Sequence, residues 1–350
     1  MAYTTIDKSS LHFNTKLYTG DESGQTITVG FQPDFTWIKT RDGAYNHQLV
    51  DAVRGNTKYL KSNATDAENT STNAVTGFVS SGFTLGADTN AWVNQNSKNI
   101  VAWNWKAGGG QGSSNTDGSI NTTYTSVNTT SGFSISTYTG TGSAGTIGHG
   151  LGVKPSMILC KRLTGSAESW VVYHQSLDAS APQDKYLHLN TTDAVGDSAG
   201  MWNDTAPTTS VFSVGSTGVS NGSGGTFVAY CFAEKTGFSK FGSYTGNGNA
   251  NGPMIYTGFK PAFLIIKRTN AANDWVMLDS KRDPINQMGK GLFPMSNSAE
   301  ATGYNLDFLS NGVKIRTSGA GENGAGAPFI FMAFAEAPLV GSNNVPCTAR

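Results

Sequence analysis

The sequence predicts an all-β protein of three tandem antiparallel β-sandwich domains, and three observations support that prediction. The chain has 43 glycines in 350 residues and a charged fraction of 14 %, against roughly 25 % in average globular proteins. Short apolar runs bounded by glycine, proline and polar turns recur along it, which is typical of strands rather than helices. The whole pattern of runs also occurs three times along the chain. Such an internal repeat is stronger evidence for the fold than a secondary-structure prediction for any single segment.

Each copy has the same elements in the same order. A strand ending in Tyr-Thr-Gly is followed by a Gly-x-x-Pro turn, an apolar strand that ends in lysine, an aromatic-led strand, a leucine-centred strand and a final aromatic strand. An asparagine stands shortly before each final strand, where it predicts a hairpin turn because asparagine accepts positive φ. The matching landmarks are Pro33, Pro155 and Pro261; Lys39, Lys161 and Lys267; Leu60, Leu187 and Leu292; and Asn94, Asn221 and Asn323.

Each final strand has one bulky face and one small face, because successive side chains point to opposite sides of a sheet. The opposite, small faces carry Ala102, Ala229 and Ala333, which would let a second layer or a neighbouring chain approach closely, so the face is a candidate subunit contact. The bulky faces, which we expect to fill the cores of the sandwiches, comprise Val101, Trp103 and Trp105; Val228, Tyr230 and Phe232; and Ile330, Met332 and Phe334.

Each copy spans about 100 residues, the size of a domain that supports its own core. We therefore expect three β-sandwich repeats, at residues 1–107, 133–238 and 239–350, the last with a C-terminal tail. Residues 108–132 are rich in Gly, Ser, Thr and Asn, a composition typical of a flexible linker. No such stretch separates the second repeat from the third, so we expect these two to dock closely. Lectin-like, jelly-roll-like and immunoglobulin-like topologies all remain open.

Charge and hydropathy exclude some classes of partner. The 24 basic and 24 acidic side chains give a net charge of zero and therefore little positive potential to attract a polyanion. We expect no nucleic acid partner. Residues 1–10 lack the basic and apolar regions of a secretory signal, and no run of about 18 apolar residues exists. We expect no membrane insertion, and a protein made in the cytoplasm without export.

Motifs for catalysis and metal binding are absent from the sequence. It contains no nucleophile elbow, no zinc-binding helix and no phosphate-binding loop, so we expect no enzyme activity, no cofactor and no metal. Asp51 and Asp279 occupy matching places, where the second copy has His174; a residue that recurs in this way is expected to close a turn through backbone hydrogen bonds. Solvent or turn roles are expected for His12, His47, His149, His174 and His188.

The three cysteines lie at non-equivalent places and give neither a disulfide framework nor a metal knuckle. Cys160 and Cys231 fall inside predicted strands, where we expect buried thiols, and Cys347 follows the last strand.

Two tryptophans are candidate ligand-binding residues. Trp92 and Trp202 lie in polar, turn-rich stretches, where an exposed ring could stack against the apolar face of a sugar. The other five fall in strands that recur between copies, and we expect them in the core: Trp37, Trp103, Trp105, Trp170 and Trp275.

Long phrases of the first copy carry a resemblance to a known family, with shorter matches in the third copy. They occur at residues 31–39, 51–55, 81–85 and 101–106, and again at 259–267, 279–282 and 331–336. These segments resemble the repeat domains of tail-fibre-like virion structural proteins from tailed phages, especially phages of marine bacteria. The resemblance extends from about Phe13 to Arg350.

The resemblance implies a phage virion structural protein. It further implies a tail appendage or fibre that joins other virion proteins, binds a host-surface glycan or protein receptor, and forms a homotrimer as many phage fibres do. It assigns no binding residues, and the repeats begin so near Met1 that we expect no separate anchoring domain. A purely structural role, decorating a capsid or joining tail parts, stays open, as does a glycan depolymerase.

Overall fold

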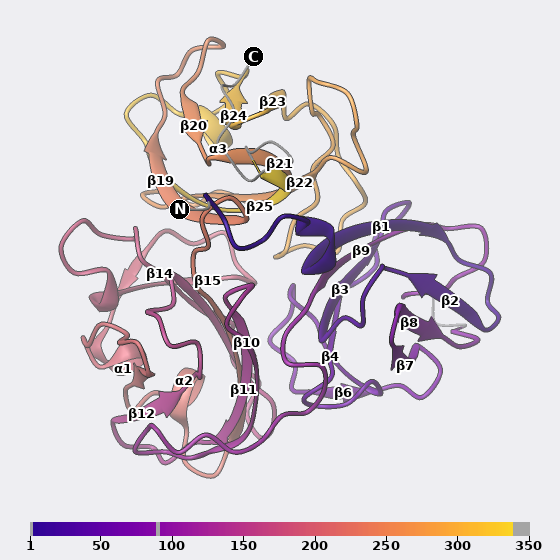
Figure 1. Ribbon diagram of the computed structural model, residues 1–350. Helices are drawn as coiled ribbons and strands as arrows, with labels where there is room; N and C mark the ends of the chain where they lie inside the picture. The colour runs from indigo at the N-terminus through magenta and orange to yellow at the C-terminus, as the bar shows by residue number, and fades with distance from the viewer. Residues whose placement is uncertain (1–2, 89–91, 339–350) are drawn as a thin grey trace.

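The protein is mostly β and is built from several antiparallel sheets (Figure 1). The computed structural model describes residues 3–88 and 92–338, so the expected C-terminal tail lies outside the described residues. Three groups of strands surround a common centre, and we call them the first lobe (residues 13–107), the second lobe (108–233) and the third lobe (239–338). No helix in the described ranges has the length and apolar character needed to cross a membrane.

The first lobe has a larger and a smaller antiparallel sheet. The larger has the order β1 (Phe13–Thr19), β9 (Asn99–Trp105), β3 (Phe35–Thr40), β4 (Gln48–Asp51), β5 (Lys58–Leu60) and β6 (Asn69–Thr70). The smaller has the order β2 (Gln25–Thr28), β8 (Gly82–Leu85) and β7 (Val75–Val79).

The second lobe repeats that order and adds a strand at the edge. Its larger sheet runs β10 (Thr122–Asn128), β11 (Phe133–Thr139), β18 (Thr226–Phe232), β13 (Met157–Arg162), β14 (Val171–His174), β15 (Lys185–His188) and β16 (Gly196–Asp197). Its smaller sheet pairs β12 (Gly145–Gly148) with β17 (Val211–Val214), and its one-turn helices are α1 (Ala199–Trp202) and α2 (Gly218–Asn221).

The third lobe has a shorter version of the same arrangement. Its larger sheet runs β19 (Ser239–Thr245), β25 (Pro328–Pro338), β21 (Phe259–Arg268) and β22 (Trp275–Asp279). Its smaller sheet runs β20 (Met254–Tyr256), β24 (Gly312–Ile315) and β23 (Leu306–Leu309), and α3 (Ala320–Asn323) precedes the last strand.

Strand register shows that the three copies align residue by residue. Trp103 lies opposite Thr15 on one side and Trp37 on the other. Its equivalents have equivalent neighbours: Tyr230 lies between Ile135 and Leu159, and Met332 lies between Phe241 and Ile265.

The bulky faces of the final strands do not fill the space between the two sheets of a lobe, so that prediction was wrong. They pack instead in one central cluster to which all three lobes contribute. The equivalent residues Trp105, Phe232 and Phe334 meet at its centre, with ring centroids 6.2, 5.7 and 6.1 Å apart. All three lobes therefore share a core, not only the second and third.

The small faces of the final strands are covered from within each lobe. Ala102, Ala229 and Ala333 belong to three further clusters, each of which lies between the larger and the smaller sheet of one lobe. Of the two occupants expected for this face, the second layer is confirmed, because the smaller sheet covers it, and the candidate subunit contact is wrong. Small residues suit that position because they let the two sheets approach closely.

The stretch expected as a flexible linker is largely structured. Residues 122–128 form β10, which pairs along β11, and Ile120 packs into the second lobe. At the start of the stretch the buried carboxylate of Asp34 accepts hydrogen bonds from the N–H groups of Ala107, Gly109 and Gly110. The polar composition of this stretch wrongly predicted a flexible linker, because its threonines and serines form β10, a strand at the edge of the sheet.

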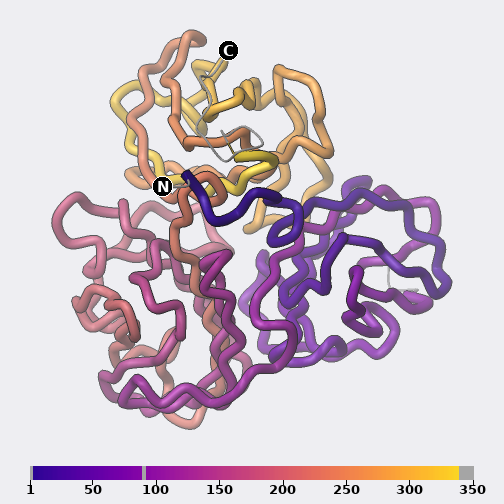
Figure 2. Tube along the Cα trace, viewed as in Figure 1, coloured from indigo at the N-terminus to yellow at the C-terminus, as the bar shows by residue number. Residues whose placement is uncertain are grey.

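Among the backbone hydrogen bonds between lobes, one occurs at all three interfaces and forms a cycle. The N–H of Glu68 donates to Leu163 O at 2.9 Å, that of Val195 to Thr269 O at 2.8 Å, and that of Glu300 to Arg41 O at 2.9 Å. The first lobe thus donates to the second, the second to the third and the third to the first. Figure 2 shows the resulting arrangement of three similar lobes around one centre.

Candidate functional site

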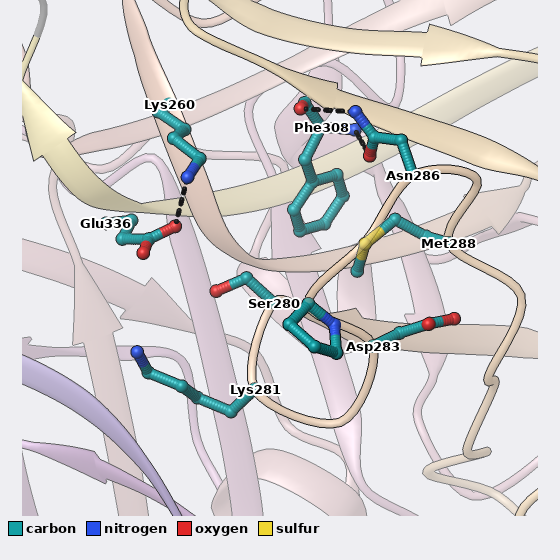
Figure 3. A pocket seen from close by; sticks show the side chains of 9 residues that line it. Lys260, Ser280, Lys281, Asp283, Asn286, Met288, Phe308 and Glu336 are labelled. Atoms are coloured by element: carbon teal, nitrogen blue, oxygen red, sulfur yellow. Dashed lines mark hydrogen bonds and ion pairs between the residues drawn. The ribbon is translucent and has the colours of Figure 1, made fainter.

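A recess of about 240 Å³ opens on the third lobe (Figure 3). It forms where β21 begins and β25 ends, beside the loop that follows β22. We call it the third-lobe recess. Its lining consists of Lys260, Ser280, Lys281, Asp283, Pro284, Asn286, Met288, Phe308 and Glu336.

A β-bulge places the two charged residues at one end of the third-lobe recess. Lys260 pairs with Ala337, but the next residue, Pro261, pairs with Ala335, so Glu336 is the extra residue of the bulge. Proline has no N–H to give to a sheet ladder and is tolerated at such a bulge. The Lys260 ammonium lies 3.1 Å from Glu336 Oε2, an oxygen that receives no hydrogen bond of good geometry from the described residues.

The loop after β22 carries the remaining polar groups and is anchored at both ends. Asp283 Oδ2 accepts a hydrogen bond from the N–H of Gly289. The side chain of Asn286 bonds both the N–H and the carbonyl of Phe308, at 2.9 and 3.0 Å. The anchoring leaves Lys281 exposed, with no partner for its ammonium group among the described residues.

The third-lobe recess offers hydrogen bonds and an apolar floor. The hydroxyl of Ser280 is buried without a hydrogen-bond partner, and in Figure 3 it is directed toward the space between Lys281 and Glu336. Phe308 and Met288 supply apolar surface beside these groups. Convergent polar groups over an apolar floor are the usual character of a ligand site.

A smaller cavity of about 50 Å³ extends the same site toward the first lobe. It shares Lys281 and Glu336 with the third-lobe recess and includes residues of β1. Its lining is Ser10, Phe13, Asn14, Thr15, Ala262, Lys281, Ala335 and Glu336. The site therefore spans the boundary between the third and first lobes.

The two tryptophans proposed from the sequence lie in different lobes. Trp202 is 2 % exposed and packs at 6.1 Å from Tyr173 inside the second lobe. Its expected exposure was wrong, because the one-turn helix α1 turns the ring inward. Trp92 is half-buried beside Tyr59, and it lines a separate small cavity in the first lobe.

The recurring carboxylates close turns, as expected. Asp51 Oδ1 accepts from the N–H groups of Val53 and Arg54, and Asp279 Oδ1 accepts from those of Lys281 and Arg282. Each also holds the arginine three residues later: the Nε–Oδ2 distance is 2.5 Å in both pairs. Burial alone would lower the pKa of Arg54, but Asp51, Tyr230 and Glu68 raise it above its usual value. The expected role is architectural, and both carboxylates are occupied in it.

The three landmark asparagines are not in hairpin turns, and that prediction was wrong. All three are fully buried, and Asn221 and Asn323 end the short helices α2 and α3. Each side-chain oxygen accepts from the residue after the Tyr-Thr-Gly glycine: Asp21, Thr141 and Asn247. A Cβ on those glycines would lie only 2.1, 2.5 or 2.3 Å from a backbone oxygen, which explains their recurrence.

The landmark lysines are also buried, and two of the three connect neighbouring lobes. Lys161 Nζ donates to Thr65 O of the first lobe at 3.0 Å, and Lys267 Nζ donates to Thr192 O of the second lobe at 2.8 Å. Lys39 donates to carbonyls of its own lobe. Burial lowers the pKa of all three to about 8.

The expectation of a solvent or turn role for the histidines is met only in part, because three of them are fully buried: His47, His149 and His174. His149 and His174 do have the turn role, since each Nδ1 accepts a hydrogen bond from the N–H two residues later. Burial lowers the pKa of each below its usual value. No group of three His, Cys, Asp or Glu side chains within residues 3–88 and 92–338 is placed to hold a metal ion. Cys160 and Cys231 are buried free thiols, as expected, and Cys347 lies outside the described residues.

The sequence did not point to the third-lobe recess, although one feature could have. Pro261 interrupts a strand-like run, and proline inside a strand indicates a bulge. The loop after β22 is also much longer than the loop after β4, the equivalent strand of the first lobe.

Comparison with known proteins gives a family but no activity. No curated protein matches the chain. A family match covers residues 8–338 and therefore spans all three lobes as a single unit. The chain belongs to the family described as Domain of unknown function (DUF7483).

Proposed function

We propose that this chain is a non-enzymatic phage virion structural protein, a tail appendage or fibre that binds a host-surface glycan or protein. The virion assignment rests on the resemblance of residues 31–39 and 101–106 to tail-fibre-like repeat domains. Host binding rests on one observation, the third-lobe recess, where Ser280 Oγ is buried without a hydrogen-bond partner between the exposed Lys281 and the Lys260–Glu336 ion pair.

The architecture in this proposal is three tandem β-sandwiches around a shared centre. Its support is the recurring order of larger sheet and smaller sheet in each lobe. Each pair of sheets encloses its own apolar cluster, in addition to the central one. Such a body is rigid, because separating any two lobes would expose the aromatic residues of the central cluster.

The third-lobe recess suits a hydroxylated ligand that also carries an acceptor for an ammonium group. Lys281 can donate to a carboxylate, sulfate or carbonyl oxygen, and Glu336 can accept from a hydroxyl. Phe308 offers apolar surface for the C–H face of a sugar. Bacterial surface glycans carry these groups together, and several weak sites on one particle would raise avidity without tight single sites.

Binding to whole cells tests this proposal. Labelled full-length protein is incubated with a panel of marine bacterial strains, and retained fluorescence is measured. We expect binding to a subset of strains, and a loss of at least about tenfold for Lys281→Ala, since a charge-assisted hydrogen bond contributes about 1.5–3 kcal/mol. Lys154→Ala, an exposed lysine on the second lobe, is the matched control and should bind as the unaltered protein does.

The second candidate function is a purely structural one, decorating a capsid or joining tail parts. The cyclic hydrogen bonds between lobes favour it, because a rigid body with a central core suits assembly into a particle. Retention in purified particles, combined with no binding to any strain in the panel, would select this role. The homotrimer that the resemblance implies is checked by the mass of the protein in solution.

A further inference from the structure

A second cavity, of about 80 Å³, lies at the edge of the space between the two sheets of the first lobe. We call it the first-lobe cavity. It is larger than the roughly 10–15 Å³ that one water molecule needs. Its lining is Gln48, Tyr59, Thr70, Ser71, Asp88 and Trp92.

Gln48 is the residue that the fold does not explain. It is 1 % exposed, and its side-chain oxygen has no hydrogen-bond partner. Leaving such a group unpaired in the interior is destabilising, because its hydrogen bond to water is lost and not replaced. The equivalent residues are Val171 and Val276, since Gln48, Val171 and Val276 lie opposite the equivalent residues Ile38, Cys160 and Ile266.

Both valines are fully buried in the clusters of their own lobes. The position therefore accepts an apolar residue in two lobes out of three, and packing alone would favour one in the first lobe as well. A buried glutamine with an unpaired oxygen at the wall of a cavity indicates a ligand that supplies the missing donor.

Trp92 is positioned at the same cavity and is equally specific to the first lobe. Its backbone is held from both sides, because its N–H donates to Asp88 Oδ2 at 3.3 Å and its carbonyl accepts from the Thr40 hydroxyl at 3.0 Å. Its ring meets that of Tyr59 edge-on, with centroids 5.4 Å apart. Trp92 stands two residues before Asn94, and the residues two positions before Asn221 and Asn323 are Val219 and Gly321. Neither of these is aromatic.

The charged groups near the first-lobe cavity already have partners. Asp88 accepts from the N–H groups of Trp92 and Val93. Lys61 pairs with Asp66 at 2.6 Å and lies 5.4 Å from the centroid of the Trp92 ring. An ionic ligand would have to break these pairs. Tyr59 keeps its proton, because burial raises its pKa to about 12, so its hydroxyl can donate to a neutral ligand.

We propose that the first-lobe cavity binds one end of a neutral sugar, with a hydroxyl donating to Gln48 Oε1 and a C–H face against Trp92 and Tyr59. The ligand class is a terminal neutral hexose or N-acetylhexosamine of a glycan. This site is separate from the third-lobe recess and does not depend on the virion assignment.

Saturation-transfer NMR on the purified full-length protein tests the proposal. The probes are free glucose, galactose, mannose, N-acetylglucosamine and N-acetylgalactosamine, with sialic acid as the charged comparison. We expect saturable binding of at least one neutral sugar with a Kd on the order of 1 mM, equivalent to about 4 kcal/mol. Sialic acid should not bind at this site.

The variant Gln48→Val, which introduces the residue of the other two lobes, should weaken that binding at least tenfold while the melting temperature stays the same or rises. Trp92→Ala should weaken it likewise, whereas Trp202→Phe in the second lobe should leave it unchanged. The proposal is overturned if none of the neutral sugars binds or if Gln48→Val binds as well as the unaltered protein. It is equally overturned if a crystal soaked with sugar shows only ordered water at Gln48.

Discussion

The indole N–H of Trp103 donates a hydrogen bond to Oδ2 of Asp279 at 3.0 Å, although the two residues are 176 positions apart in the chain. The same relationship links the first and second lobes, where the Tyr230 hydroxyl donates to Asp51 Oδ2 at 2.7 Å. In the third interface His174 takes the place of the carboxylate and bonds the carbonyl of Phe331. The side chain at this equivalent position, Asp51, His174 or Asp279, therefore bonds the final strand of the next lobe in all three interfaces.

Removal of Asp279 should destabilise the whole protein. Arg282 is fully buried and would lose its closest carboxylate, keeping only Glu300 at 3.1 Å. Breaking a buried ion pair costs about 3–5 kcal/mol, and the remaining glutamate places Asp279→Ala near the lower value. Denaturant unfolding measures the change. Asp197→Ala, which removes a 64 % exposed carboxylate, is the control and should change stability by less than about 0.5 kcal/mol.

The three lobes should unfold in one transition. The central cluster joins apolar residues of all three, and Trp105, Phe232 and Phe334 touch one another within it. Calorimetry should show a single peak with equal calorimetric and van't Hoff enthalpies. Trp105→Ala should cost about 3–5 kcal/mol and lower hydrogen-exchange protection in all three lobes together. Separate peaks, or a loss confined to the first lobe, would contradict a shared core.

Much of the strand order could be predicted from the sequence, because the cues for it are local. Apolar runs such as residues 35–39 and 157–161 stand between turn residues, and they do form β3 and β13. Recurrence of Asp51 and Asp279 at matching places also indicated a turn-closing role, because a residue that recurs between copies is more often architectural than catalytic.

Which layer each strand face packs against could not be predicted in this way. Alternation shows that one face of β9 is bulkier, but both faces are buried, one in the central cluster and one within the lobe. Only the arrangement of the lobes decides between the two. The same limit hid Gln48: its equivalence to Val171 follows from strand register, which requires that the strands be paired first.

Cys160 and Cys231 should resist thiol reagents in the folded protein. Both are fully buried, and burial raises the pKa of Cys160 to about 12, so almost no thiolate forms at neutral pH. In a Cys347→Ser variant, a colorimetric thiol reagent should label no cysteine before unfolding and two in denaturant. Labelling of either thiol at a rate faster than global unfolding would show that a lobe opens by itself.

Acid should destabilise the fold through His174, which is buried where the second lobe meets the third. Its Nδ1 accepts a hydrogen bond from the N–H of Ser176 at 3.1 Å, so the proton must be on Nε2, which donates to Phe331 O at 3.1 Å. Burial lowers the pKa of His174 to about 4, below the roughly 6.5 of an unfolded chain. The unfolded state therefore binds more protons between these two values.

It follows that the contribution of His174 to stability is complete above about pH 6.5 and is lost as the pH falls toward 4, by at most about 1.4 kcal/mol per pH unit. His174→Gln can still donate to Phe331 O but does not titrate, so its unfolding free energy should be lower at pH 7 and should fall less steeply below pH 6.5. Chemical denaturation at several pH values measures both slopes. Because His47 and His149 are also buried with lowered pKa values, the variant should keep part of the slope. Equal slopes for the variant and the unaltered protein would contradict this prediction, because they would show that the pKa of His174 is the same in the folded and unfolded states.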